Sequence, residues 1–272
     1  MHNQPYFSGF APLPTGSDRW LMSDAQPHYL NPDADTLVIC IHGFTGTTYE
    51  VYPAAQAIAQ QGYAAVSPLL PGHGYKDLAE QKQQFARITK DGMLMAMRSE
   101  IRQARQKHQR VGLFGFSMGG AIALTMAAEG LVDAVAVAAP ALQLPTRAEV
   151  LIPLLSGAKF FLDAPTQVDF PTSNYKFHHS RALRTLWQLA RHGRKQLPKI
   201  QCPVFAVHSE NDPTIPATVL PLMQQKIPTK IQTAWFNDSG HIMLRDVSGA
   251  EVAAAIAAFF TMEFGNTTAI LN

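Results

Sequence analysis

Short apolar segments alternate with longer segments of helical periodicity along most of this chain, and this alternation is its most constraining feature. Most of the apolar segments lack the polar–apolar alternation of a half-exposed strand, so burial on both faces is expected. A repeated order of strand and helix favours a mainly parallel sheet with helices on both faces. The expected strands are Leu37–Ile41, Tyr63–Pro68, Val111–Phe116, Ala134–Ala139, Val204–His208 and Ile231–Phe236.

The segments that connect these strands carry the helical period, and they are long enough for an α/β fold. The expected helices are Val51–Gln61, Thr89–His108, Met118–Glu129, Ser180–Gln196, Ala217–Lys226 and Ser248–Phe264. The first expected strand begins at Leu37, so a long N-terminal arm precedes the repeating pattern.

One connection is an insertion, because it runs for about forty residues where strand–helix loops usually take about 2–6. It contains several apolar residues, too many for a solvated linker: Leu151, Ile152, Leu154, Leu155, Phe160, Phe161 and Leu162. We expect a cap over the carboxyl edge of the sheet; the alternative is an extra helix packed on its side. The predicted domains are therefore a core of residues 1–140 and 180–272, and a cap of residues 141–179.

Composition excludes several classes of function. Apolar residues make up 47% of the 272 residues and the formal net charge is +2, without a long basic run. A nucleic-acid partner needs a concentrated basic face, so none is expected. No apolar run is long enough to span a membrane, and a cytoplasmic location is expected. Cys40 and Cys202 stand alone in apolar segments, which favours free thiols over a disulfide or a zinc site.

The sequence Gly115-Phe116-Ser117-Met118-Gly119 follows the third expected strand and opens a helix of small residues. This is the G-x-S-x-G pattern in a strand–turn–helix context, in which a sharp turn exposes the serine hydroxyl above the sheet. Ser117 is therefore the candidate nucleophile.

A serine nucleophile needs a base, and the base needs a group that orients it. Asp212 lies in the loop after Val204–His208, and His241 follows Ile231–Phe236. Ligands of open α/β sheets bind at the carboxyl ends of the strands. Nucleophile, acid and histidine thus meet at one edge and in one order along the chain. Nearby carboxylates compete for the acid's role: Glu210, Asp238 and Asp246.

The glycine-containing loop His42–Thr47 follows the first expected strand, where its backbone N–H groups are free to turn inward. We expect the oxyanion hole to consist of the N–H groups of Phe44 and Met118. His42 is expected to brace this loop by hydrogen bonding rather than to act as a second base.

Together these motifs resemble the bacterial carboxylesterase and monoacylglycerol lipase family of the α/β-hydrolases, over roughly residues 36 to 264. The motifs that carry the resemblance are His42-Gly43-Phe44-Thr45-Gly46, Pro71-Gly72-His73-Gly74, Gly115–Gly120, Asp212 and Ser239-Gly240-His241. The resemblance implies a catalytic trio of Ser117, Asp212 and His241, with Phe44 and Met118 as oxyanion donors. The long N-terminal arm and a short, weakly charged cap depart from the family pattern.

The expected function is that of a serine carboxylesterase, which hydrolyses esters of short to medium acyl chains through an acyl-enzyme, with monoacylglycerols among the candidate substrates. Apolar side chains of Phe44, Leu155 and Phe161 are expected to line the acyl site. The alternatives are a perhydrolase, an acyltransferase or a carbon–carbon bond hydrolase with the same triad, and a non-catalytic ligand-binding protein. The expected partner is a small-molecule ester; the sequence does not indicate the oligomeric state.

No metal or nucleotide cofactor is expected, because the sequence has no H-E-x-x-H spacing and no glycine-rich nucleotide motif. Of the other histidines, His208 is expected in the core, and His178 and His179 are expected at the surface; the alternative is that these two line the pocket.

Overall fold

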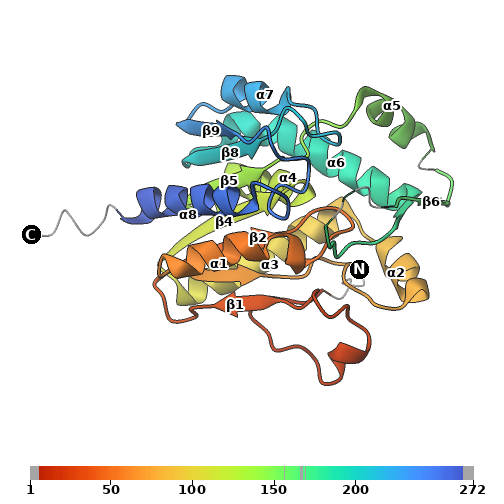
Figure 1. The fold of residues 1–272 in the computed structure, drawn as a ribbon, viewed down its shortest axis with the longest axis horizontal. Coiled ribbons are helices and arrows are strands. Elements are labelled where there is room, and N and C mark those ends of the chain that lie inside the picture. Colours follow the sequence, from red (N-terminus) through yellow and green to blue (C-terminus); the bar gives the residue numbers. More distant parts are fainter. Residues whose placement is uncertain (1–5, 156, 166–167, 169, 266–272) are drawn as a thin grey trace, which may run out of the picture.

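The computed structural model describes residues 6–155, 157–165, 168 and 170–265. Within them, a seven-stranded sheet has the order β1-β3-β2-β4-β5-β8-β9, and only β1 runs antiparallel to its neighbour (Figure 1). The strands are β1 (His28–Leu30), β2 (Thr36–Ile41), β3 (Ala64–Ser67), β4 (Arg110–Phe116), β5 (Ala134–Ala138), β8 (Val204–His208) and β9 (Ile231–Trp235). The expected mainly parallel sheet is confirmed.

Helices cover both faces of the sheet. One face is packed by α1 (Tyr52–Gln60) and α8 (Gly249–Gly265). The other is packed by α3 (Lys90–Lys107), α4 (Met118–Ala128), α6 (Ser180–Gln196) and α7 (Val219–Lys226). The short helix α2 (Leu78–Phe85) and three 3₁₀ turns, at Ser17–Arg19, Thr48–Glu50 and Leu197–Lys199, complete the core elements.

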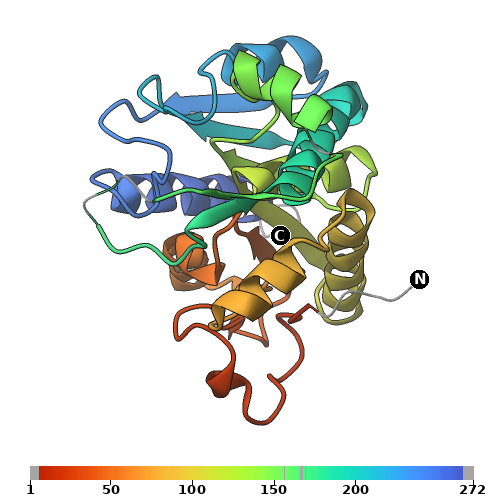
Figure 2. The same ribbon diagram turned by 90° about the vertical axis from the view of Figure 1, so that its right-hand side faces the viewer.

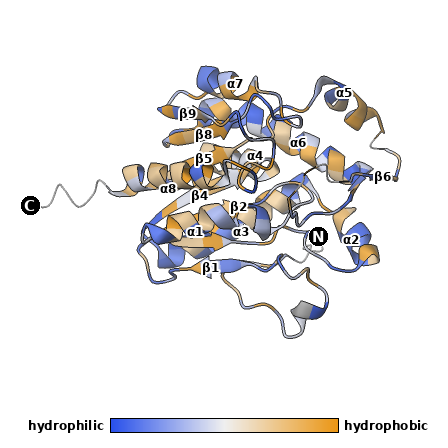
Figure 3. Ribbon diagram, viewed as in Figure 1, coloured by the Kyte–Doolittle hydropathy of each residue, from blue (hydrophilic) through white to orange (hydrophobic). Residues whose placement is uncertain are grey.

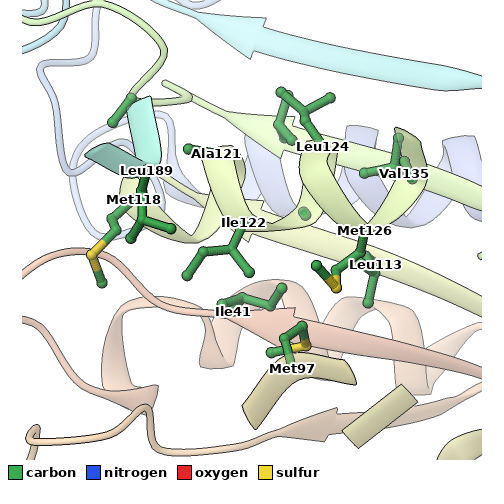
Figure 4. Close-up of a cluster of buried hydrophobic side chains, with 14 of the residues drawn as sticks. Ile41, Met97, Leu113, Met118, Ala121, Ile122, Leu124, Met126, Val135 and Leu189 are labelled. Atoms are coloured by element: carbon green, nitrogen blue, oxygen red, sulfur yellow. The ribbon is translucent and has the colours of Figure 1, made fainter. Parts of the chain in front are cut away.

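The unbroken apolar character of the strands follows from this two-sided packing. Along β2, Leu37, Ile39 and Ile41 face the layer of α3 and α4, whereas Val38 and Cys40 face the layer of α1 and α8. Side chains alternate between the faces of a strand, so a strand buried on both faces needs apolar residues at every position. Figure 4 shows Ile41 and Leu113 of the sheet beside Ile122 and Met126 of α4, with Met97 of α3 close by.

The strand β9 departs from the expected two-sided burial. Its residues are half-buried and Trp235 is exposed, because β9 lies at an edge of the sheet. At the opposite edge, the N-terminal arm forms β1. Phe7, Leu21 and Ala25 of the arm also form a small separate cluster with Leu69 and Tyr75, which follow β3.

The insert, residues 141–179, forms the helix α5 (Thr146–Leu155) and a two-stranded sheet of β6 (Phe161–Asp163) and β7 (Phe177–His179). None of the described side chains of α5 is buried. The helix lies at the surface, where Ala148 and Ile152 pack against the main core. Figure 3 shows hydrophobic residues on the central strands and also on part of α5. The two ends of the insert join the main core through Leu142, Leu144, Tyr175 and Phe177.

Figure 2, the view from the right of Figure 1, looks toward the edge where α2, α5 and the insert strands gather. Among the described helices, none combines the length and hydrophobicity that crossing a membrane requires. Residues 1–5 and 266–272 of the predicted core lie outside the described residues.

Candidate active site

Ser117 lies in the sharp turn between β4 and α4 and has the backbone angles φ 51° and ψ −115°. The turn requires glycine on both sides. A Cβ atom at Gly115 would come within 2.3 Å of the Gly119 carbonyl oxygen, and one at Gly119 within 2.2 Å of the Ile41 carbonyl oxygen. Ser117 therefore sits at the N-terminus of α4, held in a conformation that L-residues seldom adopt.

The structure brings together the three residues that the strand ends predicted. The Ser117 Oγ lies 3.1 Å from His241 Nε2, and His241 Nδ1 lies 2.7 Å from Asp212 Oδ2. Because a carboxylate only accepts hydrogen bonds, Nδ1 carries the hydrogen and Nε2 is left to accept from the serine hydroxyl. This arrangement can remove a proton from Ser117.

The carboxyl group of Asp212 is buried and multiply hydrogen-bonded. Its Oδ1 accepts the N–H groups of Thr214 and Ile215, at 2.7 and 2.9 Å. Burial by itself raises the pKa of Asp212, but the hydrogen bond from His241 and these backbone bonds outweigh it and hold the pKa below its ordinary value. The group is therefore a carboxylate at neutral pH and can hold the imidazole in one tautomer.

Asp246, a competitor for this role in the sequence, has other partners. It accepts a hydrogen bond from Ser239 Oγ at 2.7 Å and another from the Gly240 N–H at 2.8 Å. Asp246 thus supports the loop that carries His241, and neither of these two bonds involves the imidazole.

His208 occupies the end of β8, fully buried as expected. Its Nδ1 accepts the Ser209 N–H at 2.9 Å and its Nε2 donates to the Pro216 carbonyl at 3.3 Å, so both ring nitrogens have partners.

The loop after β2 carries the predicted oxyanion donor Phe44. In the described part of the chain, neither the Phe44 N–H nor the Met118 N–H is used by a protein acceptor. His42 braces the loop as expected: its Nδ1 lies 2.9 Å from the Gly43 oxygen, and its Nε2 accepts the Leu70 N–H at 3.0 Å. Burial lowers the pKa of His42 well below its ordinary value, so the ring is neutral and accepts this bond.

The insert reaches this loop, which the sequence did not predict. The Tyr175 N–H donates to the Thr45 carbonyl at 2.9 Å, and Thr47 Oγ1 donates to Ser173 Oγ at 2.9 Å. The Tyr175 hydroxyl donates to the Gly72 carbonyl and accepts the Tyr75 N–H, each at 3.0 Å. Tyr175 therefore ties the loop after β2 to the loop after β3.

The expectation of two surface histidines is wrong. His179 is buried in β7, and His178 is half-buried with its ring 5.6 Å from that of Phe44. Both residues belong to a strand packed on the core, which their sequence at the end of the insert did not indicate.

Each of the three predicted acyl-site residues contacts a different set of neighbours. Phe44 is half-buried against Phe85, with ring centroids 5.0 Å apart. Leu155 is 49% exposed and lines a hollow of about 150 Å³ between the insert and α6. None of the catalytic residues Ser117, Asp212 and His241 lines this hollow. Phe161 is 43% exposed and contacts Phe177 and His179. Their roles toward substrate stay predictions.

Within the described residues, no group of three or more histidine, cysteine or acidic side chains is placed to hold a metal. Cys40 and Cys202 are free; Cys40 is buried as expected, and Cys202 is half-buried.

Comparisons with known proteins identify relatives over most of the chain. The sequence pattern of the Alpha/beta hydrolase family matches residues 38–255. The chain is 27% identical over 259 residues to the thermostable monoacylglycerol lipase of Bacillus sp. (strain H-257), covering 90% of this chain and 98% of the relative. It is 21% identical over 217 residues to the carboxylesterase of Bacillus subtilis (strain 168), covering 78% of this chain and 87% of that relative.

A solved chain from work on two metagenome-derived lipolytic enzymes has a similar fold. Its TM-score is 0.81 at 20% sequence identity, and the alignment covers 89% of this chain and 99% of that one. At this identity the likeness bears on the fold alone.

Proposed function

The chain belongs to the alpha/beta hydrolase family, and from this premise we propose that it is a serine carboxylesterase with Ser117, His241 and Asp212 as its catalytic residues. Its function is that of an esterase of the carboxylesterase and monoacylglycerol lipase type. The observation that carries the residue assignment is the continuous hydrogen-bonded series from Ser117 Oγ through His241 to Asp212.

In the acylation step, Ser117 Oγ bonds to the ester carbonyl carbon while His241 Nε2 takes the hydroxyl proton. The tetrahedral intermediate collapses with cleavage of the bond to the alcohol oxygen, and His241 returns the proton to the leaving alcohol. Water then attacks the acyl carbon and gives a proton to His241. The second tetrahedral intermediate breaks its bond to Ser117 Oγ, which takes this proton from His241, and the carboxylic acid is released. Asp212 stabilises the imidazolium that forms in each half of the reaction.

The negative charge of the tetrahedral intermediate needs donors aimed at it. The unused N–H groups of Phe44 and Met118 supply them, and Met118 adds the positive end of the α4 dipole. A well-placed donor of this kind is worth about 2.7–4 kcal/mol to the transition state.

The proposed substrate is an ester with a short or medium acyl chain, and monoacylglycerols fit that class. Phe44, Leu155 and Phe161 are the proposed acyl-binding side chains. Support comes from the apolar character of the oxyanion loop and the insert, since each buried methylene of an acyl chain gains about 0.8 kcal/mol. The insert then acts as the cap that limits chain length.

The two free cysteines, Cys40 and Cys202, support a cytoplasmic location.

Steady-state kinetics with p-nitrophenyl butyrate and a monoacylglycerol test the proposal. The wild type is expected to hydrolyse both esters, and Ser117→Ala to lose several orders of magnitude in kcat while its Tm stays close to wild type. Ser209→Ala is the control for the loss of a serine hydroxyl near the site, because Ser209 follows β8 and its Oγ donates to the Ser239 carbonyl. This variant is expected to lose far less kcat than Ser117→Ala. Equal activity of Ser117→Ala and the wild type would refute the assignment.

A further inference from the structure

Glu50 is a buried acidic side chain that the reaction described above does not use. It ends the 3₁₀ turn Thr48–Glu50, is 8% exposed, and accepts the Gly43 N–H at 2.9 Å through Oε2. Gly43 immediately precedes Phe44, the proposed oxyanion donor. The carboxyl group of Glu50 therefore contacts the oxyanion loop directly.

The loop is shaped around this carboxyl group. A Cβ atom at Gly46 would lie 2.1 Å from Glu50 Oε2 and 2.4 Å from Oε1, so any other residue at this position would displace the carboxyl group. Glu50 thus contacts both Gly43 and Gly46, the residues that flank the Phe44-Thr45 segment. Thr45 has a φ of 62°, a strained conformation for a β-branched residue, which persists only where the surroundings hold it.

The electrostatic setting of Glu50 argues against a role in packing alone. A buried carboxyl without compensation is costly, and an apolar side chain would fill the space at less cost. Burial raises the pKa of Glu50 to about 8, although the Gly43 N–H and the attraction of Arg245 oppose the shift. Arg245 itself donates to the Tyr49 carbonyl and stacks on the Tyr49 ring. At neutral pH a large fraction of Glu50 is uncharged, which limits its repulsion of an oxyanion nearby.

We propose that Glu50 is a positioning residue for ester hydrolysis: its carboxyl group fixes the Gly43–Gly46 turn so that the Phe44 N–H faces the oxyanion. This proposal rests on the proposed function. The Phe44 N–H acts on the transition state more than on bound substrate, so a misplaced loop lowers kcat and leaves KM largely unchanged.

The test compares Glu50→Ala and Glu50→Gln with the wild type, using p-nitrophenyl butyrate at pH 7. Outright loss of an oxyanion donor costs about 10²–10³ in kcat, and for a donor that is only misplaced we expect Glu50→Ala to lose about 10- to 100-fold. The amide oxygen of Glu50→Gln can still accept the Gly43 N–H, so this variant is expected to stay within about fivefold of wild type.

Glu100→Ala is the matched control. Glu100 is also a buried carboxyl that accepts a glycine N–H, that of Gly9 at 3.1 Å, but it belongs to α3 and contacts the N-terminal arm instead of the oxyanion loop. Both alanine variants are expected to lower Tm, whereas only Glu50→Ala should lower kcat. A trifluoromethyl ketone, which forms an oxyanion on the nucleophilic serine, should bind Glu50→Ala more weakly in proportion to the loss of kcat/KM.

Gly46→Ala perturbs the same contact without removing Glu50, and it serves if Glu50→Ala does not fold. The added methyl group must displace the carboxyl, so a similar loss of kcat is expected. In the Glu50→Ala background the three atoms nearest that methyl group are absent, so it should cost less, which makes the two substitutions non-additive.

An active wild type in which Glu50→Ala and Gly46→Ala keep the kcat and inhibitor affinity of Glu100→Ala would overturn the role of Glu50 and leave the proposed function intact. A wild type without esterase activity would instead overturn the proposed function, and the Glu50 proposal with it.

Discussion

The backbone at Ser117 costs energy that the surrounding structure must supply. Its φ of 51° lies in a region that non-glycine residues seldom occupy, and such residues typically cost of order 1–3 kcal/mol. The close contacts at Gly115 and Gly119 hold the turn in place. The result is a hydroxyl that stands at a helix N-terminus and meets His241 Nε2 without rearrangement.

Asp212→Asn tests how the imidazole is oriented. An asparagine at this position can turn its amide donor toward Nδ1 and favour the wrong tautomer, so kcat should fall by about 10⁴. Asp246→Asn is the control, since Asp246 bonds Ser239 and Gly240 rather than the imidazole. Kinetics with p-nitrophenyl butyrate measure both variants; a greater loss in Asp246→Asn would contradict the assignment of Asp212.

Sequence reasoning reached Ser117, Asp212 and His241 because each lies shortly after an expected strand of the sheet, and parallel strands end at one edge. Glu50 and Tyr175 carry no such signal. Glu50 lies in a 3₁₀ turn after the oxyanion loop, and Tyr175 contacts Thr45 of that loop from 130 positions further along the chain. Only tertiary packing brings such residues to the site.

At the scale of elements, the strands and helices with strong periodic patterns could be predicted within a few residues of their observed ends. The elements β1, α2, α5, β6 and β7 were not predicted. The three strands among them have three residues each, too few for a periodic signal, and α5 contains Pro153 and packs weakly on its neighbours. The packing of β7 against the core, which no local pattern indicates, also explains the wrong prediction for His179.

Acyl-chain selectivity tests the insert as a cap. The ratio kcat/KM across p-nitrophenyl esters of two to sixteen carbons should pass through a maximum, since each buried methylene adds about 0.8 kcal/mol until the site is full. Leu155→Ala and Phe161→Ala should shift that maximum. Met262→Ala, a similarly exposed apolar residue on α8, is the control. An unshifted profile in the insert variants would remove the insert from substrate binding and leave the triad standing.

At the scale of the whole molecule, two buried layers account for the low charge of the sequence. Charged residues make up only 15% of the chain, and both faces of the central sheet are packed by helices. The alternation of strands and helices predicted this architecture, because a parallel sheet needs helical crossovers on its faces. The N-terminal arm was not predicted to pack, since its cluster is built from isolated residues such as Phe7 and Leu21.

The arm also makes stability depend on pH. Burial raises the pKa of Glu100 from 4.5 to about 7, and Oε2 of this group accepts the Gly9 N–H. The folded state therefore binds more protons than the unfolded chain between these values, so this group's contribution to stability is lost as pH rises from about 4.5 to about 7. Across that window the loss is of order 2–3 kcal/mol.

Urea unfolding of wild type and Glu100→Gln at several pH values measures this effect. The difference in the free energy of unfolding between the two proteins should change through the window, with Glu100→Gln gaining relative to wild type as pH rises. Comparing the two proteins cancels the buried histidines, such as His73, whose pKa is lowered by burial and which act in the opposite direction. A difference that stays constant with pH would show that the pKa of Glu100 is the same in the folded and unfolded states.

The central claim, an acyl-enzyme on Ser117, is tested most directly by trapping it. Wild type and Ser117→Ala are mixed with p-nitrophenyl butyrate, quenched in acid within the first turnovers, and examined by intact-protein and peptide mass spectrometry. We predict one butyryl group on the wild type, located on the peptide that contains Ser117, and none on Ser117→Ala. A butyryl group on another residue, such as Ser209 or Ser239, in an enzyme that still turns over would contradict the account.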